Sequence, residues 1–151
     1  MRILILLGSG SDVPQIEGTK KMLSQFKVPY DVIVASAHRN PQKVAKISAT
    51  AESKYDLIIA AAGMAAHLPG VVAANTILPV IGIPIETRSL SGFDSLYSIV
   101  QMPSGIPVAT VAIGGAKNAA ILAVQILSLK YPKLKVVLKA LKHKMEKGVK
   151  I

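Results

Sequence analysis

The chain has 151 residues, a formal net charge of +10 and a hydrophobic content of 51%. This length suits one domain with a substantial core, expected to span residues 1–151. The apolar runs are short and are broken by Gly, Pro and polar residues, which excludes the run of about 20 apolar residues that crosses a membrane. Because the chain has no cysteine, a disulfide framework and a thiolate metal site are also excluded, and a cytoplasmic protein is expected.

The positive charge is concentrated near the C-terminus. Residues 1–129 contain ten Lys and Arg against seven Asp and Glu, whereas residues 130–151 contain eight Lys and one Glu. The apolar residues of this tail fall at helical spacing: Leu134, Val137, Leu138, Leu141 and Met145. Residues 131–151 therefore predict an amphipathic helix with a lysine face in solvent. Nucleic-acid binding is not expected, since the tail has no arginine and one aromatic residue, Tyr131.

Five short aliphatic runs predict the strands of a parallel sheet. In chain order they are residues 2–7, 30–35, 56–62, 80–83 and 108–113. A helical pattern follows each run, which predicts an α/β fold of three layers, with helices on both faces of the sheet. Right-handed crossovers leave few topologies, and among them the flavodoxin-like strand order 2-1-3-4-5 is expected. This core covers residues 1–130, and the lysine-rich helix of residues 131–151 is an extension of it.

Several helices begin with typical capping residues. The expected caps are, in chain order, Ser11 or Asp12, Asn40, and Asp94 or Ser95. The helix expected at residues 116–129 is apolar nearly all round, so we expect it to be buried on more than one side and to make subunit contacts. The final helix is expected to begin at Pro132.

Polar or glycine-rich stretches follow the first three strands, at residues 8–12, 35–41 and 63–70. The strand order 2-1-3 places the C-terminal ends of these strands side by side, where open α/β sheets bind their ligands. The residues expected to share this cleft are Ser9, Ser11, Asp12, His38, Arg39, Gly63 and His67.

The chemistry of these residues favours a phosphorylated small molecule. The serine hydroxyls and Arg39 suit a phosphate, and Asp12 suits ribose hydroxyls because its carboxylate would repel a phosphate. His38 is the acid–base candidate, and His67 is either a second functional residue or a buried structural histidine. No metal is expected, because two histidines without clustered carboxylates give too few ligands. Without a cysteine or a Gly-x-Ser-x-Gly stretch, proton transfer in a lyase or isomerase remains.

Six blocks of the sequence resemble, in unbroken order, one enzyme family. They are Gly-Ser-x-Ser-Asp at residues 8–12, Ser-Ala-His-Arg at 36–39, Ala-Ala-His-Leu-Pro-Gly at 65–70, Leu-Pro-Val-Ile-Gly at 78–82, Asp-Ser-Leu at 94–96, and the Gln-Met-Pro stretch at 101–111. This pattern is similar to the class I, bacterial-type 5-(carboxyamino)imidazole ribonucleotide mutases of purine biosynthesis, over about residues 3–130.

The resemblance implies a homo-octamer with active sites at subunit interfaces and a ribonucleotide substrate. It implies an isomerase that needs no cofactor and moves a carboxylate from the exocyclic nitrogen to ring carbon 4, through transient carbon dioxide in a dry pocket. The catalytic residues would be His38 and His67. The substrate-binding residues would be Ser9, Ser11, Asp12, Ser36, Arg39, Gly63 and Leu68.

The sequence departs from this family at Ala61 and Met64, where the family usually has glycine. Met64 either narrows the pocket or packs into a subunit interface, and the second is favoured because methionine fills irregular gaps. One alternative function is an aminoimidazole ribonucleotide carboxylase that uses free carbon dioxide on the same fold. The others are a non-catalytic nucleotide-binding module and, least supported, nucleic-acid binding through the tail.

Overall fold

The computed structural model describes residues 1–65 and 67–150, and Ala66 and Ile151 lie outside the described residues. Five parallel strands form one sheet in the order β2-β1-β3-β4-β5. The strands are β1 (Ile3–Leu7), β2 (Tyr30–Val34), β3 (Leu57–Ala62), β4 (Val80–Pro84) and β5 (Ala109–Thr110). The predicted strand order and the parallel pairing are therefore confirmed.

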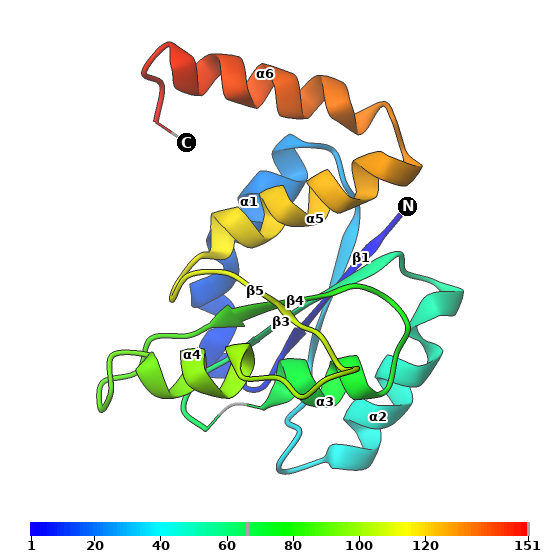
Figure 1. Cartoon of the computed structure of the whole chain (residues 1–151), viewed down its shortest axis with the longest axis vertical. Coiled ribbons are helices and arrows are strands. Elements are labelled where there is room, and N and C mark those ends of the chain that lie inside the picture. Colours follow the sequence, from blue (N-terminus) through cyan, green and yellow to red (C-terminus); the bar gives the residue numbers. More distant parts are fainter. Residues whose placement is uncertain (66, 151) are drawn as a thin grey trace.

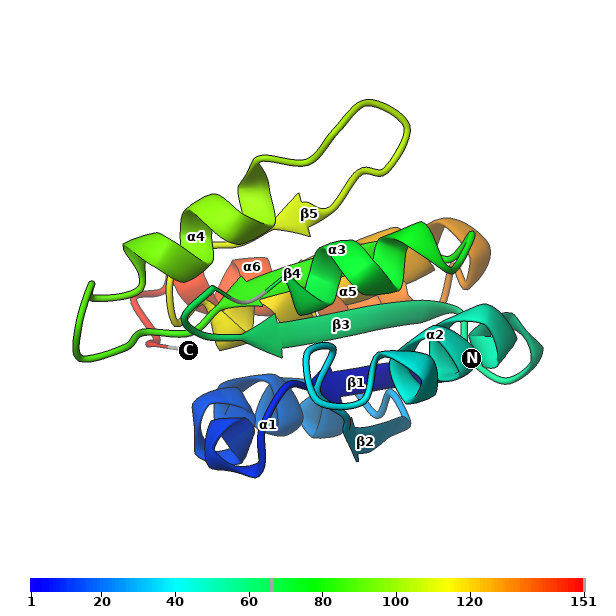
Figure 2. The same cartoon turned by 90° about the horizontal axis from the view of Figure 1, so that it is seen from below.

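Helices cover both faces of this sheet. They are α1 (Glu17–Gln25), α2 (Pro41–Thr50), α3 (Leu68–Ala74), α4 (Phe93–Val100), α5 (Ala116–Lys130) and α6 (Leu134–Glu146), with the 3-10 segments η1 (Gly10–Ile16) and η2 (Ala51–Ser53). Figure 1 shows α1 and α5 on one face of the sheet and α2, α3 and α4 on the other. Figure 1 places α6 outside α5, which it contacts, and away from the sheet. In Figure 2, seen from below, α6 accordingly lies behind the sheet.

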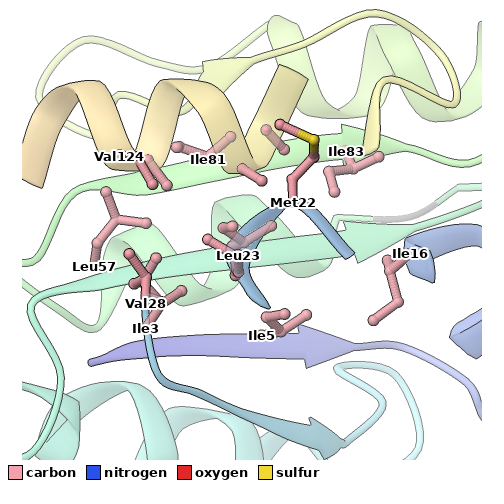
Figure 3. Packing of buried hydrophobic residues seen from close by; sticks show 14 of the residues in the cluster. Ile3, Ile5, Ile16, Met22, Leu23, Val28, Leu57, Ile81, Ile83 and Val124 are labelled. Atoms are coloured by element: carbon pink, nitrogen blue, oxygen red, sulfur yellow. The ribbon is translucent and has the colours of Figure 1, made fainter. Parts of the chain in front are cut away.

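The central strands are buried along their whole length, because helices cover both of their faces. Successive side chains of a strand point to opposite faces. In β1, Ile3 and Ile5 accordingly pack in the core below α1 and α5, which Figure 3 shows, while Leu4 and Leu6 pack in the core below α2 and α3. The aliphatic composition that predicted these strands is thus the composition of a two-sided core.

Helix α5 is buried on two sides within a single chain, as its composition predicts. Its inner face packs on the sheet and α1, and its outer face is covered by α6, whose Leu134 and Leu141 are 3% and 4% exposed. The expected subunit contacts of α5 stay a prediction. Among the residues that the structure describes, no helix is both long and apolar enough to cross a membrane.

Two expected caps and several element ends are wrong. Ser9 caps the first helical segment, since its side chain accepts from the backbone N–H of Ser11 at 3.4 Å, and residues 10–16 form a 3-10 segment before α1 begins. Gly92, at a φ of 85°, caps α4, which ends at Val100. Ser95 instead is fully buried and donates its hydroxyl to the carbonyls of Ile85 and Gly92, at 2.8 and 2.9 Å.

The cap at Asn40 is confirmed, because its side chain accepts from the backbone N–H of Lys43 at 3.1 Å. Helix α6 begins at Leu134 rather than at Pro132. Strand β5 is two residues long, shorter than the expected run. It is an edge strand, and beyond it the chain stays beside β4 through single backbone hydrogen bonds, such as Val111 N–H to Gly82 at 3.1 Å, without regular pairing.

Candidate active site

A cleft of about 750 Å³ opens at the C-terminal edge of the sheet. Loops that follow β1, β2, β3 and β4 line it, because the parallel strands all end at this edge. Every residue predicted for the site lines this cleft: Ser9, Ser11, Asp12, Ser36, His38, Arg39, Gly63, His67 and Leu68. The predicted convergence of the strand ends is therefore observed, and the individual role of each residue stays a prediction.

The loop after β1 forms a compact polar cluster. The hydroxyl of Ser11 lies 2.9 Å from the hydroxyl of Ser9 and 3.3 Å from the carboxylate of Asp12. Burial raises the pKa of Asp12, although the hydrogen bonds from Ser11 and Ser9 and the charge of Arg39 act in the opposite direction. This end of the cleft thus offers hydroxyl donors beside a carboxylate that is partly removed from water.

Ser36 fixes the turn that follows β2. Its hydroxyl accepts from the backbone N–H of Arg39 at 3.2 Å, and its carbonyl accepts from the backbone N–H of Asn40 at 2.9 Å. The Arg39 guanidinium donates to the Gly8 carbonyl at 3.5 Å, so it reaches across to the loop after β1. His38 is exposed on this turn and lines the same cleft, so its imidazole and the guanidinium of Arg39 belong to one site.

His67 stands directly before α3 and is exposed, so the reading of a buried structural histidine is wrong. Its Nδ1 lies 3.2 Å from the carbonyl oxygen of Ser98 in α4. The imidazole therefore belongs to the cleft wall while one of its nitrogens is held by a neighbouring helix.

The wall between β3 and α3 is apolar. It contains Ala62 and Leu68, which are 3% and 2% exposed, and Gly63, where an added Cβ would lie 3.1 Å from Thr87. Met64 lines the rim with a side chain that is 68% exposed and a backbone φ of 62°. The prediction that Met64 packs into a subunit interface stays a prediction.

Sequence reasoning missed the contribution of the fourth strand. Ile85, Glu86 and Thr87 follow β4 and line the cleft, as does Gln15 from η1. The expected strand order already placed the end of the fourth strand beside that of the third, and this was the signal that could have found them. Among the residues that the structure describes, no group of three or more His, Cys, Asp or Glu side chains could hold a metal ion.

Comparison with known proteins agrees with this architecture. The family model described as AIR carboxylase matches residues 2–148. An N5-carboxyaminoimidazole ribonucleotide mutase of Pyrococcus abyssi is 53% identical over 147 residues, which are 97% of this chain and 84% of the relative. The mutase of Thermotoga maritima is 49% identical over 149 residues, covering 98% of this chain and 87% of the relative.

A phosphoribosylaminoimidazole carboxylase of Candida glabrata is 53% identical over 126 residues, which are 83% of this chain and 22% of that longer protein. Among solved structures, the crystal structure of Treponema denticola PurE has a TM-score of 0.89 and 30% identity, covering 97% of this chain and 92% of that chain. These similarities extend over the sheet, the helices and the cleft alike. The chain therefore belongs to the AIR carboxylase family.

Proposed function

We propose that the chain converts N5-carboxyaminoimidazole ribonucleotide to 4-carboxy-5-aminoimidazole ribonucleotide in purine biosynthesis, as an isomerase of the cytoplasm. The observation that carries this proposal is the convergence of His38, Arg39, Asp12 and His67 on one cleft with an apolar wall. The relatives from Pyrococcus and Thermotoga that bear the mutase name support it.

The polar end of the cleft suits the ribose phosphate of this substrate. Arg39 and the hydroxyls of Ser9 and Ser11 can donate to phosphate oxygens, and Asp12 can accept from ribose hydroxyls. Ser36 shapes the turn that carries Arg39. The imidazole ring of the substrate would then extend toward Gly63 and Leu68, along the apolar wall.

The proposed reaction is balanced in protons. The bond between the exocyclic nitrogen and the carboxylate breaks, carbon dioxide leaves, and the nitrogen takes up a proton. Carbon 4 then bonds to carbon dioxide and loses its hydrogen as a proton. One group that first donates and then accepts a proton can serve both steps, and His38 is suited to this because an imidazole nitrogen can do both. No cofactor is needed in this scheme.

Transient carbon dioxide requires a site from which water is kept out. In the single chain the cleft is open enough to leave His38, His67 and Met64 exposed. We propose that neighbouring copies in a homo-octamer cover this opening, so that the carbon dioxide stays beside the apolar wall until carbon 4 captures it.

A second candidate is a carboxylase that uses free carbon dioxide, which the name of the Candida relative favours. Both reactions can be followed in buffer that contains ¹³C-labelled carbon dioxide. A mutase gives unlabelled product from the carboxyamino ribonucleotide, whereas a carboxylase prefers aminoimidazole ribonucleotide and gives labelled product. Label in the product from both substrates at equal rates would contradict the mutase proposal.

The role of His38 is tested by His38→Asn, with His143→Asn on the exposed face of α6 as the matched control. Loss of a general acid–base group lowers kcat by about 10² to 10⁴. We expect a loss of this size for His38→Asn and less than a two-fold change for His143→Asn. Equal activity of the two variants would remove His38 from the mechanism, and turnover of neither substrate by the wild type would leave a binding module.

A further inference from the structure

The imidazole of His67 lies against Gly70, a residue without a side chain in the first turn of α3. A Cβ added to Gly70 would stand 2.5 Å from Cε1, 2.7 Å from Nε2 and 3.1 Å from Nδ1 of His67. Real Cβ atoms essentially never come within 3.0 Å of such atoms, as the first two distances would require. The ring can rest on the helix only because residue 70 is a glycine.

On its other side the same ring meets α4. His67 Nδ1 lies 3.2 Å from the main-chain carbonyl of Ser98. A carbonyl oxygen can only accept a hydrogen bond, so this contact requires a hydrogen on Nδ1. In the neutral imidazole the lone pair is then on Nε2, which becomes the nitrogen that can accept a proton.

The position of the Ser98 carbonyl is fixed by the packing of α4. The neighbouring Ile99 is fully buried, and a Cβ on Gly82 of β4 would lie 2.5 Å from its Cγ2. The buried hydroxyl of Ser95, in the first turn of α4, donates to the carbonyl of Ile85, which follows β4, and to that of Gly92. These contacts hold α4 at a fixed distance from β4. The Ser98 carbonyl is therefore a fixed partner for the His67 imidazole.

We infer that Gly70 is a positioning residue for His67. The missing Cβ leaves room for the imidazole on α3, where the Ser98 carbonyl holds the hydrogen on Nδ1 and leaves Nε2 as the basic nitrogen at the cleft. The inference concerns the geometry and tautomer of His67, and it rests on the proposed function only where activity is the readout.

Gly70→Ala separates this role from a structural one. The clash would fall on a side-chain ring that can rotate away, and alanine favours a helix more than glycine does, so the variant is expected to fold with an unchanged or raised Tm. The displaced imidazole is expected to lower kcat by about 10- to 100-fold, as misplaced catalytic groups do. Gly18→Ala, in α1 and away from the cleft, is the matched control, because its Cβ would also be crowded, at 3.1 Å from Lys117 Cγ and 3.3 Å from Ala116 Cβ. It is expected to keep full activity whatever that crowding costs in Tm.

A double-mutant cycle shows whether the effect passes through His67. In a His67→Ala background, Gly70→Ala is expected to change kcat by less than two-fold, because the ring that it displaces is gone. A further ten-fold loss in that background would overturn the inference, since Gly70 would then act independently of His67.

The tautomer is measured without turnover, by long-range ¹H–¹⁵N spectra of protein with ¹⁵N-labelled histidine. The chain has three histidines, so His67→Asn assigns the signal. In the neutral ring we expect a protonated Nδ1 and a lone pair on Nε2, and loss of this preference in Gly70→Ala. A lone pair on Nδ1 in the wild type, or an unchanged pattern in Gly70→Ala, would refute the inference. If the proposed carboxylate transfer failed instead, these spectra would be unaffected.

Discussion

Met64 occupies a backbone conformation that suits glycine better than methionine. Its φ is 62°, in the left-handed region, and its side chain is 68% exposed at the rim of the cleft. In that region the Cβ of an L-residue crowds the following carbonyl. Replacing Met64 by glycine removes the Cβ while leaving the backbone path of the loop unchanged.

The size of the effect follows from two opposing contributions. Left-handed backbone costs about 1–2 kcal/mol in a residue with a Cβ. Glycine loses more conformational freedom on folding, which costs about 0.5–1 kcal/mol. Because the Met64 side chain is 68% exposed, its removal forfeits little buried area. Met64→Gly is therefore expected to raise the free energy of unfolding by about 0.5–1 kcal/mol, a rise of roughly 1–4 °C in Tm for a chain of this size.

Met64→Ala is the matched control, because alanine also lacks the long side chain but keeps the Cβ. Urea unfolding at one fixed protein concentration gives both free energies, with the slope m as a check on the unfolded state. We expect Met64→Gly to be the more stable variant by about 1 kcal/mol. Equal stability, or a more stable Met64→Ala, would refute the strain argument. If both variants were less stable than the wild type, and Met64→Gly were still more stable than Met64→Ala, this would indicate that a second copy covers the methionine side chain.

Two carboxylates are expected to act on stability in opposite directions. Burial alone would raise the pKa of Asp56, but donors that include Lys130 Nζ at 2.9 Å and Tyr131 Oη at 2.7 Å hold this pKa well below its usual range. Asp56→Asn should therefore lower the free energy of unfolding by about 1–3 kcal/mol at neutral pH. The urea midpoints of variant and wild type should converge as the pH falls below about 4, because the wild-type carboxylate then becomes protonated as well. A difference between the two midpoints that stays the same at every pH would contradict this reasoning. Burial raises the pKa of Asp12 in the folded chain, so at a pH above its usual value of 3.8 the ionised carboxylate makes folding less favourable. Asp12→Asn should therefore raise Tm at pH 7 and leave it unchanged at acidic pH. The same variant should raise KM by about ten-fold, because the proposed contact with the ribose is lost. An unchanged KM would exclude this role of Asp12.

The strands were predictable because their burial leaves a plain mark on composition. Strands β1 and β3 are apolar at every position, as two-sided burial requires. The caps were less predictable. Serine is a typical capping residue, yet the hydroxyl of Ser95 donates to the carbonyl of Ile85, ten residues earlier. That partner depends on the path of the chain between β4 and α4. Local sequence cannot fix a contact that tertiary packing creates.

The candidate site was predictable to the extent that its loops have unusual composition. Glycine, serine and histidine mark the ends of the first three strands, and the strand order brings those ends together. Glu86 and Thr87 carry no such mark, although they line the same cleft. The dependence of His67 on Gly70 was also hidden, because a glycine inside a helix gives no sign of which side chain will lie against it.

The cleft is assembled from segments that are far apart in the chain, within residues 8–15, 36–39, 62–65, 67–68 and 85–87. Such a surface exists only after β1, β3 and β4 have paired, so the unfolded chain has no comparable affinity for the ligand. A ligand at one hundred times its Kd then adds about 2.7 kcal/mol to the free energy of unfolding. Where proteolysis follows the population of opened molecules, such a ligand is expected to slow the cleavage of this chain by about 100-fold, so the bound molecule resists proteases as well as denaturants.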